Sequence, residues 1–183
     1  TGNITMADND SIGIYVEEGK GTNSGTITMS GTASAQDKTV VGMVAKAGTG
    51  KIAIIENISE KEIIAGANLG MYIAGTGTSS GKNTGKITTT TGTGVYVEGA
   101  GNSFDGSAGK IEVVTSGIGI YLENTGSNKI KSGILDIASG AVGVYGDNAK
   151  IDFTVNSSTS TGAIGVKAKN NSVISGNITT GTG

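Results

Sequence analysis

The sequence predicts an all-β fold, a single-stranded parallel β-helix in which the chain winds into about seven coils of 22 to 29 residues. The first observation behind this prediction is a short segment that recurs from end to end. Residues 116–123 read SGIGIYLE, and the Gly-apolar-Tyr core returns as IGIYV at 12–16, LGMYI at 69–73, TGVYV at 93–97 and VGVYG at 142–146, with weaker copies VGMVA at 41–45 and IGVKA at 164–168. A repeat of this length is typical of a solenoid, where each unit buries its apolar face against its neighbours.

Each copy of this segment shows the period-two alternation of a β-strand. Ile118, Ile120 and Leu122 fall on one face, whereas Gly119 and Tyr121 fall on the other. The glycines that the copies share are Gly13, Gly42, Gly70, Gly94, Gly119, Gly143 and Gly165. The alternation predicts that the apolar residues face the core and that the tyrosines lie outside it.

A second recurring strand, with the pattern Gly-x-Ile-x-apolar, precedes each copy. It reads GNITM at 2–6, GTITM at 25–29, GKIAI at 50–54, GKITT at 85–89, GKIEV at 109–113, GILDI at 133–137, AKIDF at 149–153 and GNITT at 176–180. Two such strands per coil predict that equivalent residues stack roughly 4.8 Å apart. The predicted buried ladder is Ile4, Ile27, Ile52, Ile87, Ile111, Leu135, Ile151 and Ile178, and it faces Ile14, Met43, Met71, Val95, Ile120, Val144 and Val166.

The third side of each coil is predicted to be the least regular, with a weaker strand and more turns. Its best inward candidates are Phe104, Ile130 and either Val173 or Ile174. In two coils the return link of 7 or 9 residues is too short to contain a strand.

Three coils carry longer links at the corner between the two regular strands. These insertions lie around residues 31–39, 56–67 and 156–161, and we expect them to project from one edge of the rod. Insertions collected on one face of a solenoid often form its binding surface, although tolerated surface loops also cost little free energy. In the second insertion, Ser59 to Glu62 matches a capping box that would open a helical turn.

The composition limits the classes of protein to which the chain can belong. Its 33 glycines disfavour long helices, since each Gly costs about 1 kcal/mol relative to Ala in a helix. The absence of Cys and His excludes disulfides, thiol chemistry and Ser-His arrangements. A net charge of −2 gives no basic footprint for nucleic acid, and no apolar run approaches the ~18 residues of a membrane helix. We interpret residues 1–183 as one β-helix segment excised from a longer rod.

The tyrosines and the acidic residues both recur at fixed repeat positions. Four of the five tyrosines lie on consecutive coils, and we interpret them chiefly as a stack that holds strand register; the alternative is an aromatic platform for a sugar or a protein. Two acidic stacks are predicted, Glu112, Asp136 and Asp152 in one and Glu98, Glu123 and Asp147 in the other. Ion pairing with lysine is the preferred explanation for these stacks, and a bridging Ca²⁺ is the alternative.

The candidate binding surface combines the insertions with the tyrosines. It comprises Asp37, Lys38, Glu56, Glu60, Lys61, Glu62, Tyr72, Tyr96, Tyr121 and Tyr145. No catalytic, cofactor-binding or metal-ligating residue is predicted. The acids are mixed with lysines and form no separate carboxylate pair of the kind that glycosidases use, so we expect no enzyme.

The units GIGIYLEN and GKIEV, joined by links of Gly, Thr, Ser and Asn, resemble the passenger repeats of large type V (Va) autotransporter adhesins, most closely the fusobacterial type. The resemblance covers the whole chain. It implies a right-handed β-helix, the hand that the general rule for parallel connections also favours. It further implies a passenger rod on the outer face of the bacterial outer membrane, whose parent protein is anchored by a C-terminal β-barrel.

The leading hypothesis is therefore a structural and binding segment of a bacterial surface adhesin. Its expected partners are a host-cell surface protein or glycan, or other bacteria, with no cofactor and no nucleic acid. The alternative from another class is a β-helix polysaccharide lyase or hydrolase, or a phage tailspike-like enzyme that degrades glycans. We expect the segment to be a monomer, with a trimeric fibre as the alternative.

Overall fold

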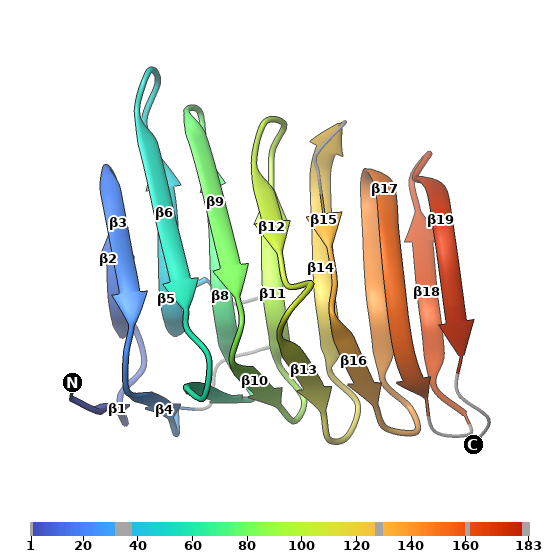
Figure 1. The fold of residues 1–183 in the computed structure, drawn as a ribbon, viewed down its shortest axis with the longest axis horizontal. Helices are drawn as coiled ribbons and strands as arrows, with labels where there is room; N and C mark the ends of the chain where they lie inside the picture. The colour runs from blue at the N-terminus through green and yellow to red at the C-terminus, as the bar shows by residue number, and fades with distance from the viewer. Residues whose placement is uncertain (1, 32–37, 127–129, 160–161, 181–183) are drawn as a thin grey trace.

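The computed structural model describes residues 2–31, 38–126, 130–159 and 162–180, and in these ranges the chain forms nineteen strands and no helix (Figure 1). Neighbouring strands pair in parallel, each with the equivalent strand of the next coil. The result is a β-solenoid of about six turns, which confirms the predicted fold class and makes the coil count slightly lower than expected.

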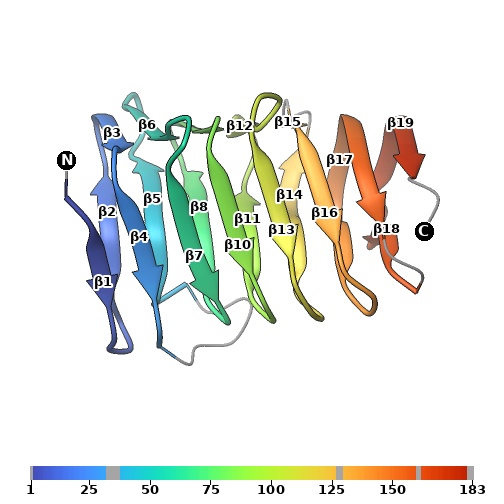
Figure 2. The same cartoon turned by 60° about the horizontal axis from the view of Figure 1, so that its bottom comes forward.

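Three sheets form the faces of the solenoid. Sheet A contains β1 (Ile4–Met6), β4 (Thr26–Met29), β7 (Glu62–Gly66), β10 (Lys86–Thr89), β13 (Lys110–Val113) and β16 (Ile134–Ile137), which lie side by side in Figure 2. Sheet B contains β2 (Ile12–Val16), β5 (Val41–Ala47), β8 (Leu69–Gly75), β11 (Thr93–Glu98), β14 (Ile118–Gly126) and β18 (Ile164–Lys169). Sheet C contains β3 (Gly19–Asn23), β6 (Ile52–Asn57), β9 (Thr78–Asn83), β12 (Ser103–Asp105) and β15 (Ile130–Lys131). The long β17 (Val142–Thr159) joins sheets A and B, and β19 (Val173–Thr180) pairs along it.

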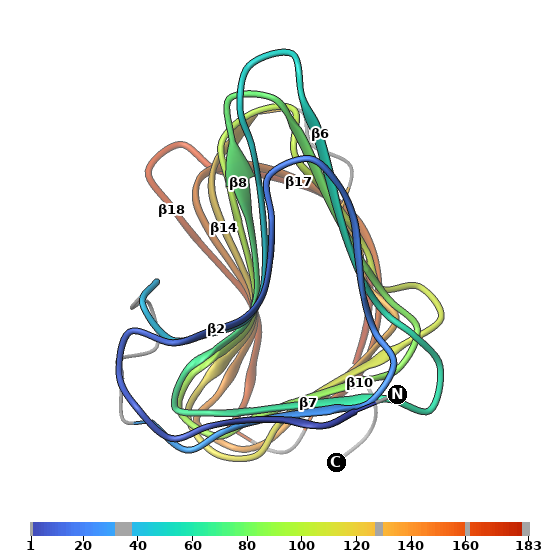
Figure 3. The same ribbon diagram turned by 90° about the vertical axis from the view of Figure 1, so that its left-hand side faces the viewer.

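The coils superimpose into a triangular outline, one face of which bends inward (Figure 3). From β8 the chain crosses the top of this view, descends on the right and returns along β10 at the bottom. The N-terminal coil is nearest to the viewer, and the chain runs clockwise as it moves away. The solenoid is therefore right-handed, as predicted.

The core is a narrow column of apolar side chains enclosed by the three sheets. Its most buried members include Ile27, Ile63, Ile87, Ile111 and Leu135 from sheet A, Met43, Met71, Val95, Ile120 and Val144 from sheet B, and Ala53, Ile55, Phe104 and Ile130 from sheet C. Full burial of one such large side chain contributes roughly 1.5–3 kcal/mol. The predicted inward residues Met43, Met71, Val95, Ile120 and Val144 of sheet B are confirmed, as are Phe104 and Ile130 on the third side. Two inward assignments are wrong: Ile118 packs outside the core against the tyrosines, and Val173 is exposed. The alternation fails at Ile118 because the shared glycine that follows it faces the core, where an added Cβ at Gly94 would meet Ile111.

The shared glycines stack directly on one another along sheet B. A Cβ on Gly94 would lie 2.7 Å from the carbonyl oxygen of Gly119 and 2.8 Å from the side chain of Ile111. The same close approach to the next coil's carbonyl recurs at Gly13, Gly42, Gly70, Gly119 and Gly143, at 2.4 to 2.7 Å. Any side chain at this position would force neighbouring coils apart, which explains why Gly recurs in every repeat.

The assignment of Ile52 to the predicted buried ladder is wrong. This residue lies in β6 on sheet C, where its side chain is 58 % exposed. Its place in sheet A is taken by Ile63, which is fully buried and in register between Ile27 and Ile87. The segment around Ile52 has the Gly-x-Ile pattern by local coincidence, whereas the true copy has lysine and glutamate before Ile63.

The last two predicted ladder positions are also wrong. Ile151 pairs with Ile174 and is not in register with Leu135, whose partner is Ser157. Ile178 is displaced in the same way. The segment around Ile52 belongs to the third side of its coil. That side is more regular than predicted, because five strands form a continuous parallel sheet there.

The three predicted insertions do not share one edge of the rod. Residues 56–67 contain β7 together with the end of β6, and residues 156–159 continue β17 in register with β16. No helical turn begins at Ser59, and Glu60 lies in a turn with φ of 63°. Most of the first insertion, residues 32–37, and residues 160–161 of the third lie outside the described residues. The coil that contains the first insertion takes 36 residues from Ile27 to Ile63, where other coils take 22 to 24.

We expect Gly94→Ala to lower the free energy of unfolding by about 1–3 kcal/mol, because the added methyl group overpacks the glycine stack. Urea unfolding followed by circular dichroism measures the change. The matched control is Gly48→Ala, since a Cβ at Gly48 meets nothing within 4 Å. Equal stability of the two variants would contradict the steric explanation of the repeat.

Candidate binding surfaces

The structure distributes the predicted site residues over three separate surfaces. Lys38 joins the four tyrosines on the outer side of sheet B. Glu60, Lys61 and Glu62 lie where the chain passes from sheet C to sheet A. Glu56 is on the outer side of sheet C, and Asp37 lies outside the described residues. The expectation that the loop residues share one edge is therefore wrong, because 56–62 belong to regular coil structure.

Tyr72, Tyr96, Tyr121 and Tyr145, hereafter the tyrosine ladder, are in register on four successive strands. The ring centroids are 5.6 Å apart for the first pair, which packs edge to face at 85°. The next two pairs are stacked, with centroids 4.6 and 4.9 Å apart. The predicted stack is confirmed, and each aromatic pair contributes roughly 0.5–1.5 kcal/mol beyond its burial.

The tyrosine ladder lies outside the solenoid core, but its rings are mostly buried. Tyr72, Tyr96 and Tyr121 are only 8, 3 and 6 % exposed. They pack in a second apolar cluster with Val41, Val44, Leu69, Ala74 and Ile118. This cluster fits the inward bend of the face that β2, β8 and β14 form in Figure 3. Most of the ring surface is consequently covered by protein, and the ladder acts mainly as a second, external core.

A row of carboxylates runs beside the rings. Glu98, Glu123 and Asp147 are in register, as predicted. The hydroxyl of Tyr72 donates a hydrogen bond to Glu98 of the next coil, and Tyr96 donates to Glu123 in the same way. These bonds tie each coil to its neighbour through side chains as well as through the backbone.

Lysines neutralise both ends of this carboxylate row. The Lys38 ammonium lies 2.7 Å from a Glu98 oxygen, and 5.2 and 4.9 Å from the ring centroids of Tyr72 and Tyr96. At the other end, Lys169 lies 3.8 Å from Asp147. Lys38 therefore combines an ion pair with two cation–π contacts, and the like charges of the row do not accumulate.

The environment of the ladder shifts its titrations. Burial, followed by the hydrogen bonds to Glu98 and Glu123, raises the pKa of Tyr72 and of Tyr96 well above the usual range. Burial and the charges of nearby carboxylates raise the pKa of Tyr121 to about 12. Burial alone would raise the pKa of Glu98, but the hydrogen bonds from Lys38 and Tyr72 outweigh it and lower that pKa.

We expect Tyr72 and Tyr96 to remain protonated until alkali unfolds the protein. Unfolded tyrosine has a pKa of about 10, so above that pH the unfolded chain releases protons that the folded chain still holds, and stability falls as pH rises. Ultraviolet absorbance of tyrosinate, recorded in buffer and in denaturant, separates the two populations. The Tyr72→Phe variant should lose one late-titrating group, whereas release of all five tyrosine protons near pH 10 in the folded protein would contradict the assignment.

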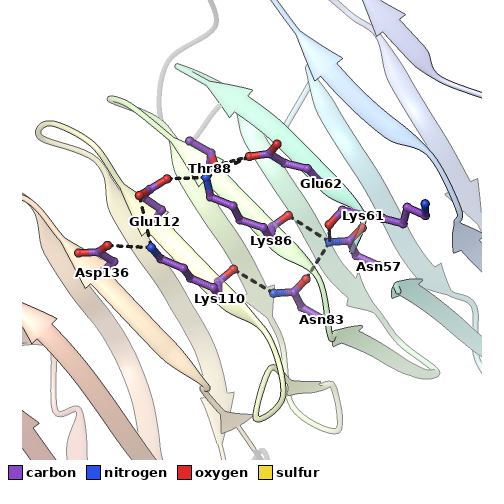
Figure 4. Close-up of polar contacts among 9 residues, drawn as sticks. All are labelled: Asn57, Lys61, Glu62, Asn83, Lys86, Thr88, Lys110, Glu112 and Asp136. Carbon is purple, nitrogen blue, oxygen red and sulfur yellow. Dashed lines mark hydrogen bonds and ion pairs between the residues drawn. The ribbon is translucent and has the colours of Figure 1, made fainter. Parts of the chain in front are cut away.

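The second surface is an ion-pair ladder on the outer side of sheet A, formed by Glu62, Lys86, Glu112, Lys110 and Asp136 (Figure 4). Lys86 lies 3.3 Å from Glu62 and 2.7 Å from Glu112. Lys110 lies 3.4 Å from Glu112 and 2.8 Å from Asp136. Charges therefore alternate along the coils, which supports the preferred explanation of the first acidic stack.

One member of that acidic stack is misplaced. Glu112 and Asp136 are in register, but the next position is Ser158, and Asp152 pairs instead with Ser175. The displacement follows from the wrong assignment of Ile151. Across the described ranges, no group of three or more His, Cys, Asp or Glu side chains is placed to hold a metal ion.

Beneath the ion-pair ladder, buried asparagines stack at the corner between sheets C and A. The Asn23 side chain donates to Asn57, and Asn57 donates to Asn83, both at 2.8 Å. Their amides also bond to backbone carbonyls, among them that of Lys86 at 3.1 Å and that of Lys110 at 3.2 Å (Figure 4). These bonds satisfy polar groups that burial would otherwise penalise, and they fix the register of the corner from which Glu60, Lys61 and Glu62 project.

Glu56 forms the third surface with two lysines. Lys20 pairs with it from the preceding coil, and Lys82 lies 3.3 Å away in the following coil. The hydrogen bond from Lys20 is the main cause that lowers the pKa of Glu56. Glu56 is therefore an anchor between three strands of sheet C.

We expect acid to weaken the ion-pair ladder through Glu112. The hydrogen bond from Lys86 is the main cause that lowers the pKa of this carboxyl, so its stabilising contribution is present above the unfolded value of about 4.3 and is lost as pH falls. The free energy of unfolding should decline from about pH 5 to pH 3, and Glu112→Gln should flatten that decline. Urea unfolding at several pH values measures the slope, and Glu60→Gln, an exposed turn residue outside the ladder, should leave it unchanged.

The fifth tyrosine, Tyr15, is the position that sequence reasoning missed. It occupies the same repeat position as the tyrosine ladder, but its neighbour in register is Val44, so no ring stacks between it and Tyr72. Tyr15 is 46 % exposed and lines a cleft at the corner between sheets B and C. The substitution of Val for Tyr in the second repeat is the signal that could have separated Tyr15 from the other four.

No family model, curated protein or solved structure matches the chain. No helix in the described part of the chain is long and apolar enough to cross a membrane.

Proposed function

We propose that the chain is a structural and binding segment of a bacterial cell-surface adhesin of the autotransporter type. The observation that carries the proposal is the in-register stacking of coils, through which outward side chains recur every ~4.8 Å along the rod. A solenoid of this kind offers an extended outer face to a large partner. The two units that carry the resemblance, GKIEV and GIGIYLEN, form β13 of sheet A and β14 of sheet B.

The side-chain ladders also support a load-bearing role. Neighbouring coils are joined by stacked tyrosines, alternating ion pairs and buried asparagine amides, in addition to backbone hydrogen bonds. Such a rod resists separation of its coils, because several kinds of contact must break together. This property suits a segment that holds a binding site away from a cell surface.

The carboxylates favour this proposal over the glycan-degrading enzyme. A general acid working near neutral pH needs a raised pKa, whereas hydrogen bonds lower the pKa of Glu56, Glu98 and Glu112. Each of these groups is held by a lysine of the same chain. These three acids therefore act as structural partners of lysine.

In this proposal the segment stands on the extracellular face of the outer membrane, in a parent chain anchored by a C-terminal β-barrel. Its partner is a host-cell surface protein or glycan, or another bacterium. The segment works as a monomer, which analytical ultracentrifugation tests against a trimeric fibre.

We expect the purified, folded chain to attach saturably to epithelial cells or to partner bacteria and to release no sugar from their surfaces. Flow cytometry measures attachment, and a reducing-end assay measures release. A variant for comparison replaces residues 32–37 with a short Gly-Ser linker. Residues 56–67 stay intact because they contain β7. Intact β circular dichroism together with weaker attachment of this variant would locate the contact at the long coil.

Two outcomes would contradict the proposal. If the folded chain attached neither to epithelial cells nor to partner bacteria, the binding role would be contradicted. Release of reducing ends from a surface glycan would favour the polysaccharide lyase or hydrolase instead.

A further inference from the structure

The gap in the tyrosine series leaves one aromatic ring accessible. In the register of sheet B, Val44 separates Tyr15 from Tyr72, so the two rings are two coils, or about 10 Å, apart. Val44 itself is only 2 % exposed and forms a low apolar floor in the second cluster. On the side that faces Tyr72, Tyr15 thus presents aromatic surface that its counterparts in the tyrosine ladder bury against one another.

A cleft of about 480 Å³ opens beside Tyr15, and we call it the Tyr15 cleft. It is lined by Tyr15, Glu17, Glu18, Lys46, Ala47, Gly48, Lys51, Gly75 and Thr76, which come from three successive coils. The turn between β5 and β6 extends well beyond the turn between β2 and β3 and so overhangs it (Figures 1 and 3). Gly48 and Lys51 of this turn line the cleft. Its volume falls within the roughly 300–1,000 Å³ typical of small-ligand sites.

The overhanging side of the cleft is made largely of backbone. A Cβ on Gly75 would lie 2.2 Å from the carbonyl oxygen of Ala47, so the two coils approach too closely for a side chain here. Gly75 also has φ of 114°, which favours glycine. Beside it, the hydroxyls of Thr49 and Thr76 are 3.0 Å apart. The carbonyl of Ala47 already accepts a hydrogen bond from Gly77, so Thr76 is the small polar side chain that this side of the cleft offers a ligand.

The charged groups around the cleft offer both donors and acceptors. Glu17 accepts a hydrogen bond from the Tyr15 hydroxyl at 3.1 Å, which orients the ring. Glu18 pairs with Lys51 at 2.7 Å, and Lys46 lines the cleft from the second coil. Two carboxylates and two ammonium groups leave the lining without net charge, so it does not suit a phosphate or another polyanion. Alternating donors and acceptors beside an aromatic face instead match a polyhydroxylated ring.

We propose that the Tyr15 cleft binds a pyranose residue of a cell-surface glycan. The apolar C–H face of the sugar stacks on the Tyr15 ring, and its hydroxyls bond to the carboxylates, to Lys46 and to Thr76. This inference rests on the proposed adhesive function and specifies one ligand class for it. It assigns recognition to the one tyrosine that the ladder leaves out.

The test is binding of the purified chain to a panel of hexose, N-acetylhexosamine and uronic-acid oligosaccharides, read by saturation-transfer nuclear magnetic resonance and by titration. We expect at least one sugar to bind and Tyr15→Ala to weaken it about tenfold, the upper end of what one aromatic contact contributes. Tyr15→Phe keeps the ring and should bind within about threefold of the original chain. Lys46→Ala should also weaken the same sugar.

The control variant is Val114→Ser, which changes an exposed residue outside the cleft lining and should leave binding unchanged. Binding of no sugar in the panel, or equal binding by Tyr15→Ala and the original chain, would overturn the proposal. Cell attachment without sugar binding would remove the cleft proposal and leave the adhesive function standing. Sugar binding without cell attachment would support the cleft proposal and contradict the adhesive function.

Discussion

The parallel pairing of each strand with its equivalent in the next coil is the constraint on which the rest of the structure depends. It places identical repeat positions about 4.8 Å apart, a spacing at which side chains either support or clash with their counterparts. Stacked tyrosine rings, alternating charges and asparagine amides are favourable at this distance. On sheet B the backbones approach so closely at Gly94 that only glycine fits. Each ladder in the molecule is one solution to the same geometric demand.

Side-chain contacts stabilise the solenoid both inside it and on its outer surface. The apolar column inside is narrow, because each coil contributes only a few side chains to it. The tyrosine ladder adds a second cluster on the outer side of sheet B, with Lys38 closing one end of it through Glu98. Polar ladders at the other corners satisfy buried amides and neutralise like charges. A small amount of core per coil is thus supplemented by contacts that run along the rod.

The use of outward side chains in contacts between coils limits where this chain can bind a partner. Side chains that stack on their counterparts are already engaged, so the most regular repeat positions are the least available for recognition. We expect side chains that can contact a ligand where a ladder is interrupted, as it is at Val44 beside Tyr15. The proposed recognition site of this solenoid therefore lies at a departure from the repeat.

The local alternation of the Gly-apolar-Tyr strand, and the return of that strand along the chain, were enough to predict the fold class, the inward residues of sheet B and the tyrosine stack. Period two within the repeat predicts a strand with an inner and an outer face, and it holds from Ile120 onward. It fails at the shared glycine, so that Ile118 packs outside the core with the tyrosines. The Gly-x-Ile strand could not be placed in this way, since Ile52 carries the local pattern whereas Ile63, the true copy, follows Lys61 and Glu62. The register between coils decided the choice: Ile63 lies between Ile27 and Ile87, and Asn57 bonds to Asn23 and Asn83. That choice moved Glu56, Glu60, Lys61 and Glu62 from one supposed loop onto two faces, and only the tertiary structure could make it, because contacts between coils join residues that are far apart in sequence.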